Sequence, residues 1–154
     1  MSPIASFFIS VSSGAIAAFL GSLWAVRRFY KQKTWERRER AYEEIVNALY
    51  DVIQYCAVQK EDYGQGTGLS EDKERELRSK YYSATSSLSK ATDIGSFYIS
   101  DDAYNVLTEL RGRETFNPNE EPWFEIFESE RQEHKKALNK LMDIAKRDLH
   151  IGKT

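Results

Sequence analysis

Residues 6–22 read SFFISVSSGAIAAFLGS, a stretch that has no charged side chain but is rich in serine, alanine and glycine. It lies inside a longer uncharged run, residues 4–26, and the first charged side chain of the protein is that of Arg27. At about 1.5 Å per residue, a helix over this run is roughly 34 Å long, enough to cross a bilayer core of about 30 Å. The sequence therefore predicts a transmembrane helix within residues 1–26.

A basic segment follows the apolar run directly. Residues 27–40 carry seven basic side chains against two acidic ones, and no Lys or Arg precedes the run. The basic residues are Arg27, Arg28, Lys31, Lys33, Arg37, Arg38 and Arg40. The positive-inside rule predicts an external N-terminus, a basic juxtamembrane helix over 27–40 at the lipid headgroups, and a cytoplasmic C-terminal domain. The alternative, a cleaved signal peptide, requires a basic residue ahead of the apolar run.

Small residues recur at every fourth position of the predicted span, and positions four apart share one face of a helix. One row is Ser6, Ser10, Gly14, Ala18 and Ser22, and the row beside it is Ser13, Ala17, Gly21 and Ala25. Lipid supplies no hydrophobic drive for helix association, so side chains that let two backbones approach predict a helix-packing face. The expected partner is a second copy, giving a homo-oligomer, or a companion membrane protein. The alternative is that the spacing arose by chance.

The rest of the chain shows the apolar periodicity of amphipathic helices. Apolar side chains recur three and four residues apart in four segments, which cover residues 35–56, 77–91, 103–110 and 123–149. Glycines separate these segments, and Ser70 and Ser100 are the expected N-caps of two of them. The predicted fold class is all-α. The transmembrane helix continues into a cytosolic antiparallel bundle over 41–150, with three long helices and one short helix, and residues 151–154 form a tail.

Few residues suggest catalysis or metal binding. Glu130 and His134 stand four apart with Glu133 beside them, but the chain has only two histidines and lacks the spacing of a zinc site. Cys56 lies on an apolar face without an activating neighbour in the sequence, which is typical of a core thiol. The glycine-rich stretch 64–68 lacks the flanking residues of a phosphate-binding loop. We therefore expect no catalytic, metal-binding or cofactor-binding residue.

Charge and aromatic content limit the partners of the predicted cytosolic domain. Residues 41–154 have 15 basic against 22 acidic side chains, a net charge of −7, so a nucleic-acid backbone would be repelled. Tyr82, Tyr98 and Phe124 each follow another aromatic residue, and adjacent residues of a helix cannot both face one small core. These three residues are the predicted partner surface. The alternative is that they fill the bundle and its loops.

Residues 27–49, RRFYKQKTWERRERAYEEIVNAL, directly follow the predicted span. This segment resembles a group of small, uncharacterised bacterial single-span inner-membrane proteins, which share a basic juxtamembrane Trp-Glu-Arg/Lys segment and a helical cytosolic domain. The similarity includes the stretch Asp93-Ile94-Gly95-Ser96-Phe97 and covers most of the chain. The resemblance implies a location in a bacterial inner membrane and implies no activity or site residues.

These features predict a noncatalytic single-pass protein. It would assemble or dock through the small-residue face and bind a partner or cue through its cytosolic bundle. The alternative is an oligomeric effector, of the kind used in phage defence, that disrupts the membrane or forms a pore. In that case the hydroxyls of Ser6, Ser10, Ser13 and Ser22 would line a polar path. A membrane-tethered enzyme is the third alternative, although no catalytic motif favours it.

Overall fold

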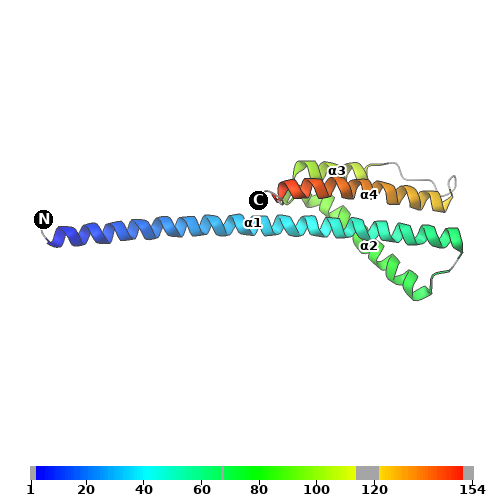
Figure 1. Cartoon of the computed structure of the whole chain (residues 1–154), viewed down its shortest axis with the longest axis horizontal. Coiled ribbons are helices and arrows are strands. Elements are labelled where there is room, and N and C mark those ends of the chain that lie inside the picture. Colours follow the sequence, from blue (N-terminus) through cyan, green and yellow to red (C-terminus); the bar gives the residue numbers. More distant parts are fainter. Residues whose placement is uncertain (1–2, 67, 114–121, 151–154) are drawn as a thin grey trace. The chain divides into compact units, whose positions relative to one another are not determined.

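The computed structural model of the chain describes residues 3–66, 68–113 and 122–150, and the side chains of residues 3–18, 65 and 96 lie outside this description. The elements in order are α1 (Pro3–Gln65), α2 (Glu71–Ile94), the 3-10 turn η1 (Gly95–Phe97), α3 (Asp101–Arg111) and α4 (Trp123–Asp148), as Figure 1 shows. No strand occurs in these ranges. The predicted all-α class is therefore confirmed.

The chain divides into two compact units, Met1–Arg37 and Arg38–Thr154. The first unit is made by the first part of α1, and its side chains are described from Phe19 onward. The large apolar and aromatic side chains from there to residue 30 are all exposed, namely Phe19, Leu20, Leu23, Trp24, Val26, Phe29 and Tyr30. Over the described part of the chain, no helix combines the length and apolar character required to cross a membrane. The transmembrane helix stays a prediction.

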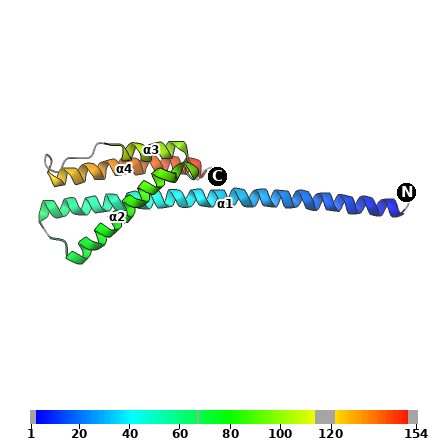
Figure 2. The ribbon, with the colours of Figure 1, turned by 180° about the vertical axis from the view of Figure 1, so that it is seen from behind.

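The second unit is a helical bundle, as expected. Within it α4 runs beside α1 in the opposite direction, α3 packs on α4, and α2 crosses α1 obliquely (Figures 1 and 2). The oblique crossing departs from a regular antiparallel arrangement. Its physical reason is composition, because residues 71–80 of α2 contain a single apolar side chain, Leu77, and the buried residues of this helix all follow Tyr81. Only the second half of α2 has a face to bury.

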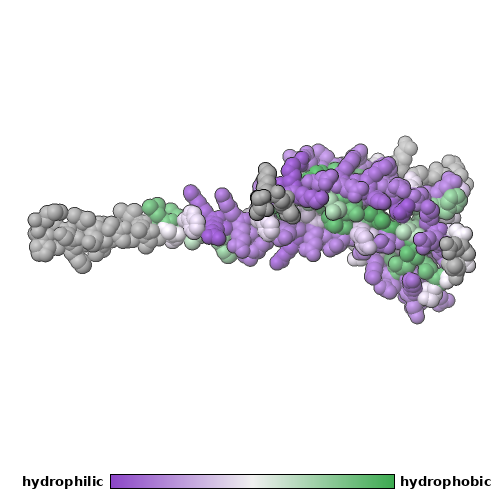
Figure 3. Space-filling model, viewed as in Figure 1, coloured by the Kyte–Doolittle hydropathy of each residue, from purple (hydrophilic) through white to green (hydrophobic). Residues whose placement is uncertain are grey.

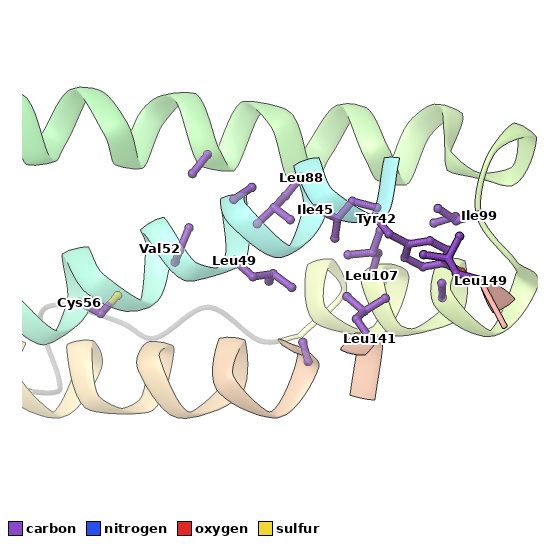
Figure 4. Packing of buried hydrophobic residues seen from close by; sticks show 14 residues of the cluster. Tyr42, Ile45, Leu49, Val52, Cys56, Leu88, Ile99, Leu107, Leu141 and Leu149 are labelled. Atoms are coloured by element: carbon purple, nitrogen blue, oxygen red, sulfur yellow. The ribbon is translucent and has the colours of Figure 1, made fainter. Parts of the chain in front are cut away.

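One hydrophobic core holds the bundle together. The residues that α1 contributes recur at three- and four-residue spacings, and Figure 4 shows them in a row: Tyr42, Ile45, Leu49, Val52 and Cys56. The other helices supply Leu88 from α2, Leu107 from α3 and Leu141 from α4. Burial of these apolar surfaces drives the association of the four helices. The predicted apolar stripes are therefore confirmed at these positions.

A cluster of three polar residues, here called the polar cluster, closes one end of this core. The Tyr42 hydroxyl donates a hydrogen bond to the Asp148 carboxylate, and the Ser100 backbone N–H donates to the same hydroxyl oxygen over 3.3 Å. Burial raises the pKa of Tyr42, and the bond to Asp148 raises it further. Burial would raise the pKa of Asp148 as well, but hydrogen bonds from Ser100 and Tyr42 outweigh it and hold that pKa below its usual value. The polar cluster thus joins α1, the start of α3 and the end of α4.

Replacing Ser100 by alanine is expected to lower the free energy of unfolding by about 1 kcal/mol. Its side chain accepts a hydrogen bond from the backbone N–H of Ala103, 3.4 Å away, and so caps α3. Ser70 is the matched control, because within the described residues its side chain makes no capping hydrogen bond to α2. Urea denaturation of the full chain in mild detergent, followed by circular dichroism, measures both variants. An equal loss for Ser70→Ala would contradict the capping role of Ser100.

Candidate functional site

The predicted membrane-surface residues all lie on α1. Arg38 is half-buried, and the six others, Arg27, Arg28, Lys31, Lys33, Arg37 and Arg40, are exposed. The guanidinium carbon of Arg28 lies 5.4 Å from the centre of the Trp24 ring, and the Lys33 ammonium lies 5.7 Å from the centre of the Phe29 ring. Both geometries are cation–π contacts. An aromatic ring beside an exposed cation is a combination suited to a lipid–water interface.

The predicted packing face is described at three of its nine positions, Gly21, Ser22 and Ala25. The other six positions are Ser6, Ser10, Ser13, Gly14, Ala17 and Ala18, and they fall in the part of α1 whose side chains the structure does not describe. A Cβ added at Gly21 would meet no described atom within 4 Å, so packing within this part of the chain does not require glycine there. The Ser22 hydroxyl donates to the Phe19 carbonyl over 2.8 Å and is satisfied within the helix. Gly21 is therefore open to contact with another helix.

A cavity of about 270 Å³, here called the central cavity, opens between α2, α3 and α4. Leu88, Leu107 and Leu110 provide much of its apolar wall, and Arg113, Glu130 and His134 line its polar side. The Arg113 guanidinium forms an ion pair with the Glu130 carboxylate. The Arg113 Nη1 atom is buried and has no hydrogen-bond partner within the described residues. The polar side of the cavity is thus organised by one partly buried ion pair.

His134 is held by Glu130 in a defined tautomer. Its Nδ1 lies 2.8 Å from the Glu130 backbone oxygen and 3.5 Å from the Glu130 side-chain Oε2. A carbonyl oxygen only accepts hydrogen bonds, so Nδ1 carries the proton and Nε2 is an acceptor. Burial lowers the pKa of His134. Glu133, the third residue considered for a metal, forms an ion pair with Lys136 over 2.5 Å, and the described residues contain no group of three side chains placed to hold a metal ion.

Replacing His134 by glutamine is expected to flatten the dependence of stability on pH between 7 and 5. In the unfolded chain His134 takes up a proton near its usual pKa of 6.5, whereas in the folded protein its pKa is lower. The unfolded state therefore binds more protons than the folded state. As the pH is lowered, this residue decreases the free energy of unfolding by up to about 1.4 kcal/mol per pH unit. The unaltered chain, measured at the same pH values, is the control. Denaturation midpoints measured at several pH values test this, and an unchanged slope in His134→Gln would contradict it.

Cys56 belongs to the core rather than to a reactive site. Burial raises the pKa of its thiol to about 12, so the thiolate that acts as a nucleophile is scarce at neutral pH. The side chain packs with Leu49 and Val52 in the core. This placement agrees with its position on the apolar face of the segment.

Tyr82, Tyr98 and Phe124, the predicted partner surface, are all exposed, but they do not form one patch. Tyr98 lies beside Ser100 and therefore at the end of the bundle that holds Asp148. Phe124 is at the start of α4, roughly 36 Å from Asp148 at the helical rise. On the face that Figure 3 shows, the surface of the bundle is mostly hydrophilic. Tyr98 and Phe124 therefore belong to different local surfaces.

A second cavity, of about 350 Å³ and here called the aromatic cavity, lies where α1 ends and α2 and α4 begin. Its aromatic wall consists of Tyr55, Tyr63, Trp123 and Phe127, and its polar lining consists of Gln59, Asp62, Glu74 and Arg78, with Leu69 beside them. The sequence did not predict this site. One signal was present, because Tyr55, Gln59 and Tyr63 recur at every fourth position and share a face of α1.

Comparisons of the chain with protein-family models, with curated proteins and with solved structures found no match.

Proposed function

We propose that this chain is a noncatalytic single-pass protein of a bacterial inner membrane, and that its helical bundle binds a partner or cue in the cytoplasm. The observation that carries the proposal is the exposed apolar surface of α1. From Phe19 to Tyr30 its large apolar and aromatic side chains have no cover within the described residues. A helix that is apolar on all sides is typical of a protein core or a membrane span. Lipid acyl chains are the cover that we propose for residues 4–26.

The flanking charges support the proposed orientation. The uncharged run has no basic residue before it and seven within the fourteen residues after it. Carbonate extraction of bacterial membranes is expected to leave the full chain in the membrane fraction. External protease should spare the bundle in intact spheroplasts and digest it after lysis. Release by carbonate would contradict the span, and digestion in intact spheroplasts would contradict the orientation.

Replacing Gly21 by leucine is expected to weaken self-association of the full chain at least tenfold in mild detergent. The reason is that leucine would separate two backbones that approach at the small-residue rows. Nothing described in its own chain lies within 4 Å of a Cβ at this position, so the variant leaves the single subunit intact. Leu20→Ile is the control, since Leu20 lies off both rows. Light scattering measures the oligomer, and a monomer in all three proteins would leave a companion membrane protein as the partner.

The second candidate function is a membrane-disrupting or pore-forming effector. It is favoured by the serine content of the proposed span, where Ser6, Ser10, Ser13 and Ser22 would present hydroxyls on or beside one face. The main proposal expects cells that express the chain to keep their membrane potential. Depolarisation by the unaltered chain, and its loss when the four serines are replaced by alanine, would favour the effector instead.

A further inference from the structure

We propose that the aromatic cavity binds an organic cation through its guanidinium or ammonium group. The inference rests on the function proposed above and identifies the chemistry of the cue. The group can be carried by a free polyamine or by an arginine or lysine side chain of a partner protein. Three independent features of the cavity carry the argument: its aromatic wall, its charge and an unpaired amide.

The aromatic wall of the cavity consists of rings that contact one another. The Tyr63 and Trp123 rings are nearly parallel, with centres 6.4 Å apart, and the Phe127 ring centre lies 5.9 Å from each of them. Tyr63 and Trp123 remain exposed although they contact one another. The face of an aromatic ring carries partial negative charge and attracts cations, tryptophan most strongly. Such a wall selects for a cation with a flat or apolar surface over a hydrated inorganic ion.

The charges of the lining also favour a cation. Asp62 and Glu74 line the cavity, and Arg78, the basic residue among the described lining, forms an ion pair with Glu74 over 2.5 Å. The lining therefore has a net charge of −1. The C-terminal end of α1 adds partial negative charge there, and its last turn contains no basic residue. The bundle as a whole is acidic, so a cation is attracted from a distance as well.

Gln59 supplies a hydrogen-bonding group that the rest of the site does not use. The residue is only 8% exposed and lines the cavity, and within the described residues its amide makes no hydrogen bond. A ligand N–H can donate to the oxygen of this amide in place of solvent. In the central cavity the Glu130 carboxylate and the His134 Nδ1–H are already paired, and the group without a partner within the described residues is Arg113 Nη1, which belongs to a cation. The aromatic cavity is thus the better prepared of the two for an organic cation.

The test uses the full chain in a nonionic detergent, titrated by calorimetry with Nα-acetyl-argininamide and with its neutral isostere Nα-acetyl-citrullinamide. The proposal expects the arginine compound to bind at least tenfold more tightly, because only it carries a positive charge. Trp123→Leu and Gln59→Leu should each weaken binding at least fivefold. Arg78→Gln should strengthen it several-fold, since Glu74 is then released for the ligand. Tyr82→Leu, which removes an exposed aromatic ring outside the lining, should change nothing.

Several results would overturn the proposal. They are equal binding of the two amides, weaker binding in Arg78→Gln, or unchanged binding in both Trp123→Leu and Gln59→Leu. Trp123→Phe, which keeps a ring in place, checks that a loss in Trp123→Leu does not come from misfolding and should retain most of the affinity. Spermidine and an arginine-containing peptide then distinguish the two sources, and tighter binding of either one supports the site. Carbonate extraction separates this inference from the proposed function, because a chain that stays in the membrane without binding cations contradicts the cavity alone.

Discussion

Replacing Leu141 by alanine is expected to lower the free energy of unfolding by about 2–5 kcal/mol. Leu141 is 0% exposed and belongs to the core with Leu49 of α1 and Leu107 of α3 (Figure 4). The shorter side chain loses its transfer free energy and leaves a cavity among three helices that can close only in part. Urea denaturation of the full chain in mild detergent, followed by circular dichroism, gives the difference.

Met142 is the matched control for this substitution. It is the next residue of α4, lies 42% exposed, and has a helix propensity close to that of alanine. Met142→Ala should therefore change the free energy of unfolding by no more than about 0.5 kcal/mol. Similar losses for both variants would show that the buried face of α4 differs from the one described.

Replacing Tyr42 by phenylalanine is expected to lower the free energy of unfolding by about 1–3 kcal/mol at pH 7. The substitution keeps the ring in the core and removes only the hydroxyl, which donates to the Asp148 carboxylate and accepts from Ser100. The carboxylate is left with one donor fewer in a site where its side chain is 11% exposed. An ionised group with little access to water depends on such donors, which is why a single oxygen atom has so large an effect.

The effect of Tyr42→Phe should depend on pH in a defined direction. The pKa of Asp148 in the folded protein lies below its usual value of 3.8. The stability that this carboxylate contributes is present above pH 3.8 and is lost as the pH falls through the folded value. The difference between the variant and the unaltered chain should therefore shrink in acid. Tyr50→Phe, at an exposed position, should leave the free energy of unfolding unchanged at every pH. For Tyr42→Phe, a loss of stability that does not vary with pH would contradict the role of Asp148.

The helices of this protein are predictable because their apolar residues recur with the helical period. Tyr42, Leu49 and Leu107 fall where the periodicity places them, and Ser100 caps α3 as its position before Asp101 and Asp102 suggests. Trp123 is the informative exception. The periodicity places it on the inner side of α4, yet it is half-exposed and stacks beside Tyr63 and Phe127. At the first turn of a helix a large ring reaches the edge of the bundle rather than its centre.

The cavities were beyond the reach of sequence reasoning because each depends on the angle between helices. The aromatic cavity requires the end of α1 to meet the beginnings of α2 and α4, and the oblique path of α2 follows from a composition that periodicity does not measure. The ion pair of Arg113 and Glu130 likewise joins two segments of the chain, and no local sequence pattern predicts that these segments come close together. The spacing of Glu130 and His134 was considered for a metal and not predicted to bind one, and in the structure the imidazole contacts a backbone oxygen of its own helix. Local patterns thus identified side chains that share a face, and long-range contacts decided what those side chains do.

The polar cluster also bears on how the protein is made. The two residues joined by its central hydrogen bond, Tyr42 and Asp148, are 106 positions apart in the chain. A ribosome adds roughly 5–20 residues per second, so this contact must wait about 5 to 20 seconds after Tyr42 has been added. During that interval the core face of α1 cannot reach its final packing against α4. The nascent chain therefore presents an incompletely covered apolar surface for seconds, a period in which chaperones can bind it.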